Sequence, residues 1–480
     1  MSNSKSPWFW VPTLYFAEGI PYFIVNVISV TMFKRLGMPN GDLAMYTSLL
    51  YLPWVIKPLW SPFVDVIRTK RWWILLMQLL CVAGFAALAL SVRPDAFALT
   101  LIIFYVIAFA SATHDIAADG FYMLALNPTQ QAAFVGIRST FYRIASVFGQ
   151  GVIVVLAGLL EERLGVIPRA WAITLLACSA FFALITLWHT RFLPKVESVS
   201  LPPDGSCPSS AIGLRSARPT LTGKTATEGH CRSGEQMIPS GQEGAAERAF
   251  PQRSEDTFQP GRLQPSCRDG VKVFQGFAES WKTFFLKPGV GLAITFMLLY
   301  RLPEAFSVKM LTPFLLDPPD VGGLGLSTAQ SGLVYGTVGV IALTVGGILG
   351  GLYAARKGLR RSMWPMSMAL ALPCAVYLFL ALAQPASLWV IYLCVALDQF
   401  GYGFGFTAYM LYMMQFSEGA FKTSHYAICT GFMALSMMLP GLIAGWMQEA
   451  LGYVGFFIVV MICCLATVFV TFFARRRCSA

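Results

Sequence analysis

Long apolar stretches separated by short polar connections make up most of the chain. A helix that crosses a membrane needs about 20 consecutive, mainly apolar residues. Twelve stretches meet this requirement, at residues 8–33, 42–64, 72–92, 97–124, 131–159, 169–193, 288–316, 326–354, 362–383, 388–415, 421–448 and 452–474. The pattern predicts an all-α membrane protein with twelve transmembrane helices and both termini on one side.

The composition supports a membrane protein. The 480 residues are 56% hydrophobic and only 12% charged, whereas a soluble domain is about one quarter charged. The net charge of +11 does not indicate nucleic-acid binding, because the basic residues lie in short clusters between apolar stretches. We therefore expect a lipid bilayer and a small solute as partners, no nucleic acid, and a monomer.

The distribution of Lys and Arg over the connections predicts the orientation. Cytoplasmic connections carry more Lys and Arg than external ones. The connections on the side away from the termini hold only Lys34, Arg35, Arg93, Arg163 and Arg169, and the other side holds many more. We expect cytoplasmic N- and C-termini.

One long segment has a different composition. Residues 196–271 are rich in Ser, Gly, Pro, Glu and Arg and poor in apolar residues, a composition typical of disorder. We interpret this segment as a cytoplasmic linker between a six-helix bundle at 1–195 and a second one at 272–480. Apolar residues at helical spacing predict a short amphipathic helix on the membrane surface at the start of the second bundle.

The two halves resemble each other at an offset of 287 residues. "FYMLAL" at 121–126 corresponds to "AYMLYM" at 408–413, and "LAGLLEERLG" at 156–165 corresponds to "IAGWMQEALG" at 443–452. Two pseudo-symmetric six-helix halves resemble the major facilitator fold, which implies a solute site between the halves near the middle of the membrane.

The connection "SPFVDVIRTKRWW" partly matches the acidic and basic signature of that fold. We assign an inner gate to Asp65, Arg68 and Arg71, together with Lys57. For Lys57, a long side chain that extends to the inner interface is an alternative.

Ionisable side chains inside the expected helices are candidates for function, because each costs about 2.5–3.5 kcal/mol at the bilayer centre. Ser111, Asp115, Asp119 and Tyr122 follow helical spacing and share one face. Asp115 and Asp119 are candidates for the solute or proton pathway, and Asp119 could instead form a structural ion pair at a gate. Arg143 could bind solute or pair with Asp115.

Three further charged positions extend this pathway. Glu18 precedes Gly-Ile-Pro in the first stretch, and burial favours the protonated form of a carboxyl group, so Glu18 is a candidate proton site. Arg301 and Glu304 flank Pro303 and could pair with each other or hold solute across from Glu18. Tyr402 corresponds to Asp115 at the offset of 287 residues and is expected on the opposite side of the cavity. His114 points away from Asp115 and is expected in a helix interface, and His425 on the surface.

No enzyme chemistry is expected. The eleven cysteines lack the spacing of a metal site, and the four histidines form no motif. We expect no catalytic residue, no cofactor and no bound metal. A membrane acyltransferase or a receptor is a distant alternative.

Three segments resemble the AmpG-type muropeptide permeases, whose branch also contains acetyl-CoA transporters and siderophore permeases. These are "IKPLWSPFVD" at 56–65, "IAFASATHDIAADGF" at 107–121 and "YRIASVFGQG" at 142–151. The resemblance implies proton-driven import of anhydromuropeptides across a bacterial cytoplasmic membrane. Glu18 and His114 depart from the family pattern, so a siderophore or other small-solute permease is the alternative.

Overall fold

The computed structural model describes residues 6–195, 276, 278–419 and 421–476. The expected linker at 196–271 lies outside these residues. A helix at 278–285 stands where the amphipathic segment is expected, and the Phe284 side chain is fully buried while that of Phe285 is 45% exposed. All regular secondary structure in the described residues is helical.

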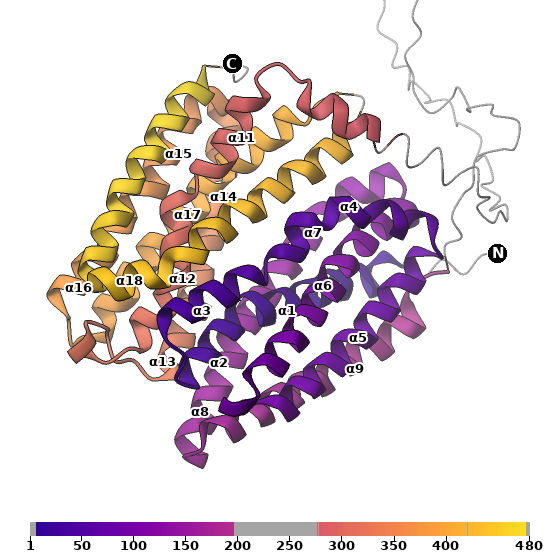
Figure 1. Ribbon diagram of the computed structural model, residues 1–480. Coiled ribbons are helices and arrows are strands. Elements are labelled where there is room, and N and C mark those ends of the chain that lie inside the picture. Colours follow the sequence, from indigo (N-terminus) through magenta and orange to yellow (C-terminus); the bar gives the residue numbers. More distant parts are fainter. Residues whose placement is uncertain (1–5, 196–275, 277, 420, 477–480) are drawn as a thin grey trace, which may run out of the picture. The chain divides into compact units, whose positions relative to one another are not determined.

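The N-terminal half consists of six spans, some of them built from more than one helical segment (Figure 1). In chain order the segments are η1 (Pro7–Phe9), α1 (Val11–Phe23), η2 (Ile24–Ile28), α2 (Ser29–Arg35), α3 (Asn40–Leu49), α4 (Leu52–Val66), α5 (Lys70–Ser91), η3 (Pro94–Ala96), α6 (Phe97–Ala125), α7 (Pro128–Val147), η4 (Phe148–Ile153), α8 (Val154–Leu164) and α9 (Ile167–Phe192).

The C-terminal half repeats this arrangement. Its segments are α11 (Val290–Leu299), α12 (Leu302–Leu316), η5 (Pro319–Val321), α13 (Thr328–Ser331), η6 (Gly332–Gly339), α14 (Val340–Lys357), α15 (Leu359–Ala371), η7 (Leu372–Cys374), α16 (Ala375–Ala383), α17 (Leu388–Phe416) and α18 (Lys422–Arg475). The π-helical segments η4 and η6 pack against each other across the halves.

The twelve expected spans are present in the described residues, and the fold class is confirmed. Ten helical stretches are long and apolar enough to cross a membrane. One of them, α18, contains two expected spans, divided where Gly452 adopts a φ of 66°. The remaining expected span is interrupted at Leu50 and Tyr51, between α3 and α4. Neither α3, with 10 residues, nor α4, with 15 residues, is long enough to cross a membrane alone.

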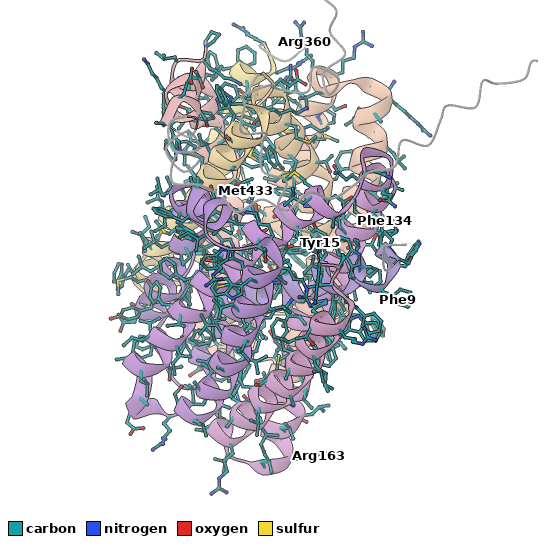
Figure 2. The ribbon with its side chains drawn as sticks, turned by 90° about the vertical axis from the view of Figure 1, so that its right-hand side faces the viewer. Phe9, Tyr15, Phe134, Arg163, Arg360 and Met433 are labelled. Carbon is teal, nitrogen blue, oxygen red and sulfur yellow. The ribbon has the colours of Figure 1, made fainter. Side chains whose placement is uncertain are left out.

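The outward surface of the spans is apolar. Large side chains such as Leu184, Leu187, Leu393 and Phe469 are each at least 65% exposed, as expected for side chains that face lipid. Arg163 and Arg360 lie at opposite ends of the bundle (Figure 2). We call the end that carries Arg163 and the connections 36–39, 165–166 and 317–327 the distal end.

The two halves meet tightly at the distal end through glycine. A Cβ atom on Gly158 of α8 would collide with the backbone of Ala329 in α13, and one on Gly445 of α18 would collide with the carbonyl oxygen of Asn40 in α3. Gly158 and Gly445 are 287 residues apart, which is the offset of the internal repeat. Small residues let helix backbones approach closely in membranes. We call these two contacts the distal seam.

Side chains reinforce both contacts of the distal seam. On one side, Glu161 accepts hydrogen bonds from Thr328 Oγ1 at 2.6 Å and from Arg35 Nε at 3.0 Å. On the other side, Gln448, which is also 287 residues beyond Glu161, accepts a hydrogen bond from Asn40 Nδ2 at 2.7 Å. Lys34 Nζ lies 2.6 Å from Asp317 Oδ1. The distal seam is therefore closed in this structure.

We expect the substitution Gly445→Val to hold the distal seam open, because the added side chain overlaps Asn40 and overpacking costs about 1–3 kcal/mol. Ala44 of α3 is 1% exposed and packs with residues of α12, so an Ala44→Cys variant without native cysteines reports opening. Its rate of maleimide labelling in detergent is expected to rise at least fivefold with Gly445→Val. Gly351→Val is the control, since no atom lies within 4 Å of a Cβ there. Equal labelling rates in the Gly445→Val and Gly351→Val variants would show that the contact at Gly445 does not keep the distal end closed.

Candidate functional site

A cluster of ionisable side chains lies inside the N-terminal half. Asp115 and Asp119 project from one face of α6. The ammonium of Lys57 on α4 pairs with Asp115, and Arg138 Nη2 on α7 lies 2.9 Å from Asp119 Oδ1. Tyr15 of α1 donates a hydrogen bond to the same oxygen at 3.0 Å. We call these five residues and Glu18 the N-cluster.

Two alternatives that the sequence left open for this cluster are excluded. Lys57 does not extend to the inner interface, because Asp115 neutralises it within the bundle. The assignment of Lys57 to an inner gate stays a prediction. Asp115 pairs with this lysine and not with Arg143, which takes part in no ion pair among the described residues. The spacing of residues along α6 gave the shared face but carries no information on which helix faces it.

Glu18 is the carboxyl group of the N-cluster that has no cation partner among the described residues, and it lies beside the carboxyl group of Asp115. Its side chain on α1 is buried, and its Oε2 atom has no hydrogen-bond partner. The charged side chains whose electrostatic fields reach the Glu18 carboxyl group are those of Asp115, Asp119 and Arg138. Three carboxyl groups thus face two cations, Lys57 and Arg138, and the cluster carries one more carboxyl group than it can neutralise by ion pairing.

The C-terminal half holds a second charged group at the break between α11 and α12. Arg301 donates hydrogen bonds to Glu304 at 2.7 and 2.9 Å and to the Tyr402 hydroxyl at 2.8 Å. The ring of Phe406 lies 4.8 Å from the guanidinium carbon. Of the two roles that the sequence leaves open for Arg301 and Glu304, the structure has the mutual pair, with Tyr402 from α17 as a third member.

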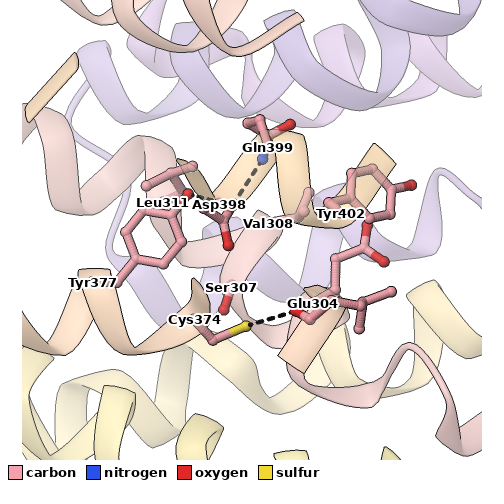
Figure 3. A pocket seen from close by; sticks show the side chains of 10 residues that line it. Glu304, Ser307, Val308, Leu311, Cys374, Tyr377, Asp398, Gln399 and Tyr402 are labelled. Carbon is pink, nitrogen blue, oxygen red and sulfur yellow. Dashed lines mark hydrogen bonds between the residues drawn. The ribbon is translucent and has the colours of Figure 1, made fainter. Parts of the chain in front are cut away.

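A small cavity of about 10 Å³ lies beside Glu304 and is lined by Asp398, Tyr377 and Ser307 (Figure 3). A cavity of this size is just large enough to admit one water molecule. Asp398 accepts hydrogen bonds from Tyr377 at 2.7 Å and from Gln399 at 3.0 Å, so its hydrogen-bond donors within the described residues are neutral.

Aromatic side chains lie between the two charged groups. Tyr22 on α1 contacts Trp54 with ring centroids 5.2 Å apart, Tyr142 at 6.4 Å and Tyr51 at 6.5 Å. Tyr51 in turn packs with Ala305, Met437 and Met438 of the other half. Flat faces with hydroxyl groups suit the apolar faces of sugar rings and their hydroxyls.

Sequence reasoning missed a buried polar chain through the N-terminal half. Gln78 of α5 lies 3.0 Å from His114 Nε2 and 3.0 Å from His189 Nδ1, and His189 Nε2 lies 3.0 Å from Thr13. His114 thus makes the expected helix-interface contact. A glutamine, two histidines and a threonine on four different helices have no local spacing that would reveal them.

Two further expectations concern the inner ends of the spans. The placement of the Asp65 side chain lies outside the described part of the structure. Arg68 is exposed with a φ of 62°, and Arg71 Nη2 donates to the carbonyl oxygen of Thr190 at 2.7 Å. The expectation that His425 is a surface residue is wrong, because it is 2% exposed and contacts Ser280.

The arrangement can bind and release protons and can hold a polar solute, and it has no feature of a metal site. In the described residues no group of three or more His, Cys, Asp or Glu could hold a metal ion. The side chains of Lys57 and Asp115 are 19% and 18% exposed and are therefore partly shielded from water. Removal of either charge should leave the other without adequate compensation.

We expect Lys57→Met to destabilise the protein by about 1–3 kcal/mol, because it leaves Asp115 partly buried without its cation. The double variant Lys57→Met with Asp115→Asn removes both charges and should regain most of the lost thermal stability. Thermal unfolding in detergent measures both effects, and Arg68→Met at an exposed position is the control. A double variant no more stable than Lys57→Met would refute the pairing.

Comparison with known proteins agrees with this architecture. The "Major Facilitator Superfamily" profile matches residues 13–424. The anhydromuropeptide permease of Escherichia coli K12 is 23% identical over 452 residues, covering 93% of this chain and 75% of that protein. A putative transporter, AmpG 1, of Rickettsia prowazekii is 26% identical over 188 residues, covering 39% and 41% of the two chains. The resemblance to AmpG-type permeases is thereby confirmed.

Solved structures show the same fold at low sequence identity. A bacterial homologue of the human lysosomal transporter Spinster, in an inward-facing and unoccupied conformation, superposes with a TM-score of 0.64 at 13% identity, covering 99% of this chain and 98% of that one. The nucleoside transporter NupG superposes with a TM-score of 0.61, also at 13% identity, with 98% of each chain covered. The chain is an integral membrane transporter that belongs to the Major Facilitator Superfamily.

Proposed function

We propose that this transporter imports anhydromuropeptides together with protons. The observation that carries the proposal is the excess carboxyl group of the N-cluster, where Glu18, Asp115 and Asp119 face only Lys57 and Arg138. A buried carboxylate without a cation is costly, and a proton removes that cost. One proton bound per cycle couples solute movement to the membrane potential.

The energy of this coupling is sufficient for accumulation. Each elementary charge that crosses the membrane releases about 2.3 kcal/mol per 100 mV. At 1.4 kcal/mol for each factor of ten, one proton supports a roughly fifty-fold concentration ratio. Glu18 is the proposed proton acceptor, and Asp115 and Asp119 transmit its charge state to Lys57 on α4 and Arg138 on α7.

The proposed solute site combines aromatic and cationic groups. Tyr22, Tyr51 and Trp54 offer stacking surfaces for sugar rings, and Arg301, held by Glu304 and Tyr402, offers donors to a carboxylate. Arg143, a half-buried cation without an ion pair in the described residues, is the second proposed anion contact. The similarity to the Escherichia coli permease supports muropeptides as the solute class.

The proposed setting is the bacterial cytoplasmic membrane, with both termini in the cytoplasm and a monomeric protein. In this orientation the closed distal seam faces outside. Asp65, Arg68 and Arg71 then lie at the cytoplasmic end, where we place the inner gate. Alternating access would open each end in turn around the central site.

The test is uptake of radiolabelled anhydromuropeptide into proteoliposomes with an imposed inward proton gradient. We expect Glu18→Gln to abolish gradient-driven accumulation, at least tenfold below the unmodified protein, while solute exchange without a gradient continues. Asp320→Asn, at an exposed carboxylate, is the matched control. Equal accumulation by Glu18→Gln and the control would exclude Glu18 as the proton site. A correctly folded protein that takes up no muropeptide would favour a siderophore or another small solute.

A further inference from the structure

Lys309 is a buried cation that the charged clusters do not use. It lies near the middle of α12 and is 3% exposed. Its Nζ atom has a single hydrogen-bond partner, Thr47 Oγ1 of α3, at 3.3 Å, and the ring of Tyr51 lies 5.0 Å away. Among the ion pairs of the described residues, none includes Lys309.

The contacts of Lys309 within the described residues are with a hydroxyl group, an aromatic ring and a glycine, and none is with an acid. Thr47 and Ser48 come from α3, and the Oγ atom of Ser48 is buried without a partner. From α18, Gly441 lies against both Ser48 and the Lys309 stem. A hydroxyl and an aromatic face offset only part of the cost of removing an ammonium group from water.

Four other cations of the two halves are paired. Lys34, Lys57, Arg138 and Arg301 each have a carboxylate partner at hydrogen-bonding distance. Arg143, which has no ion pair among the described residues, is half-buried, whereas Lys309 is 3% exposed. An unpaired cation is retained here at the junction of α3, α12 and α18, where the halves must separate if the distal seam opens. On opening, Lys309 would meet water and solute, and the cost of its burial would be recovered.

We propose that Lys309 is an anion-binding residue of the state in which the distal seam is open, where it receives a carboxylate or a similar anionic group of the solute. In the closed state Lys309 lacks such a partner, and its buried charge raises the free energy of that state relative to the open state. The anion therefore favours the open state, and closure requires that the anion leave Lys309. This inference depends on the transporter fold and not on the identity of the solute.

The experiment measures opening of the distal seam with and without a simple anion. The full chain carrying Ala44→Cys and no native cysteine is purified in detergent. The rate at which a small maleimide labels this cysteine is measured for the protein that retains Lys309 and for the Lys309→Arg and Lys309→Met variants. We expect Lys309→Met to label at least fivefold more slowly, because an apolar side chain stabilises the closed seam. Lys309→Arg keeps the charge and should stay within twofold.

Acetate and acetamide, which have nearly the same shape, then separate charge from size. At matched ionic strength, acetate should raise the labelling rate of the Lys309 and Lys309→Arg proteins at least twofold, and acetamide should not. Neither should affect Lys309→Met. Unchanged labelling of Lys309→Met without additive, or an acetate effect that persists in Lys309→Met, would overturn the proposal. Size-exclusion profiles verify that all three proteins are folded, and the Gly445→Val variant gives the labelling rate of an open seam.

Discussion

The cost of an uncompensated charge in an apolar medium determines how this protein is organised. Hydrocarbon offers no partner to an ionised side chain, so each one must find its partner within the bundle. Lys57 with Asp115, Arg138 with Asp119 and Arg301 with Glu304 satisfy this requirement inside single halves. Because these pairs do not cross between the halves, the halves can separate without breaking them. Among the described residues, Glu18, Arg143, Lys309 and Asp398 have no ion pair. In the proposed mechanism, Glu18 responds to a proton and Lys309 to an anion.

The pseudo-symmetry of the halves explains how the distal end closes. Gly158 and Gly445 occupy equivalent positions in the repeat, and each admits a helix of the opposite half at backbone contact distance. Glu161 and Gln448 stand one turn further on in each copy and accept hydrogen bonds from Thr328 and Asn40. The repeat therefore places an equivalent contact on each side of the seam, and Glu161 in addition forms an ion pair with Arg35.

The sequence predicts those features that depend on local composition. Apolar runs locate the twelve spans, and the offset of 287 residues between "LAGLLEERLG" and "IAGWMQEALG" predicts the two halves. The face of Asp115 and Asp119 follows from helical spacing. Partners across helices do not follow, because the contact of Lys57 with Asp115, or of Gln78 with two histidines, depends on how α4, α5, α6 and α9 pack. The burial of His425 against Ser280 likewise comes from a helix that is distant in sequence.

The position of α4 links the N-cluster to the opposite half. Lys57 holds Asp115 from α4, and α4 packs directly on α18, where a Cβ atom on Gly431 would lie 3.0 Å from the carbonyl oxygen of Val55. A movement of α18 relative to the N-terminal half must therefore displace α4 or break this contact. A change of charge at Glu18 alters the electrostatic potential at Asp115. It therefore alters the strength of the ion pair between Asp115 and Lys57. A ligand shifts a conformational equilibrium only by its difference in affinity between two states. In the proposed mechanism, the Lys57–Asp115 pair is the contact that makes the affinity for a proton differ between the two states.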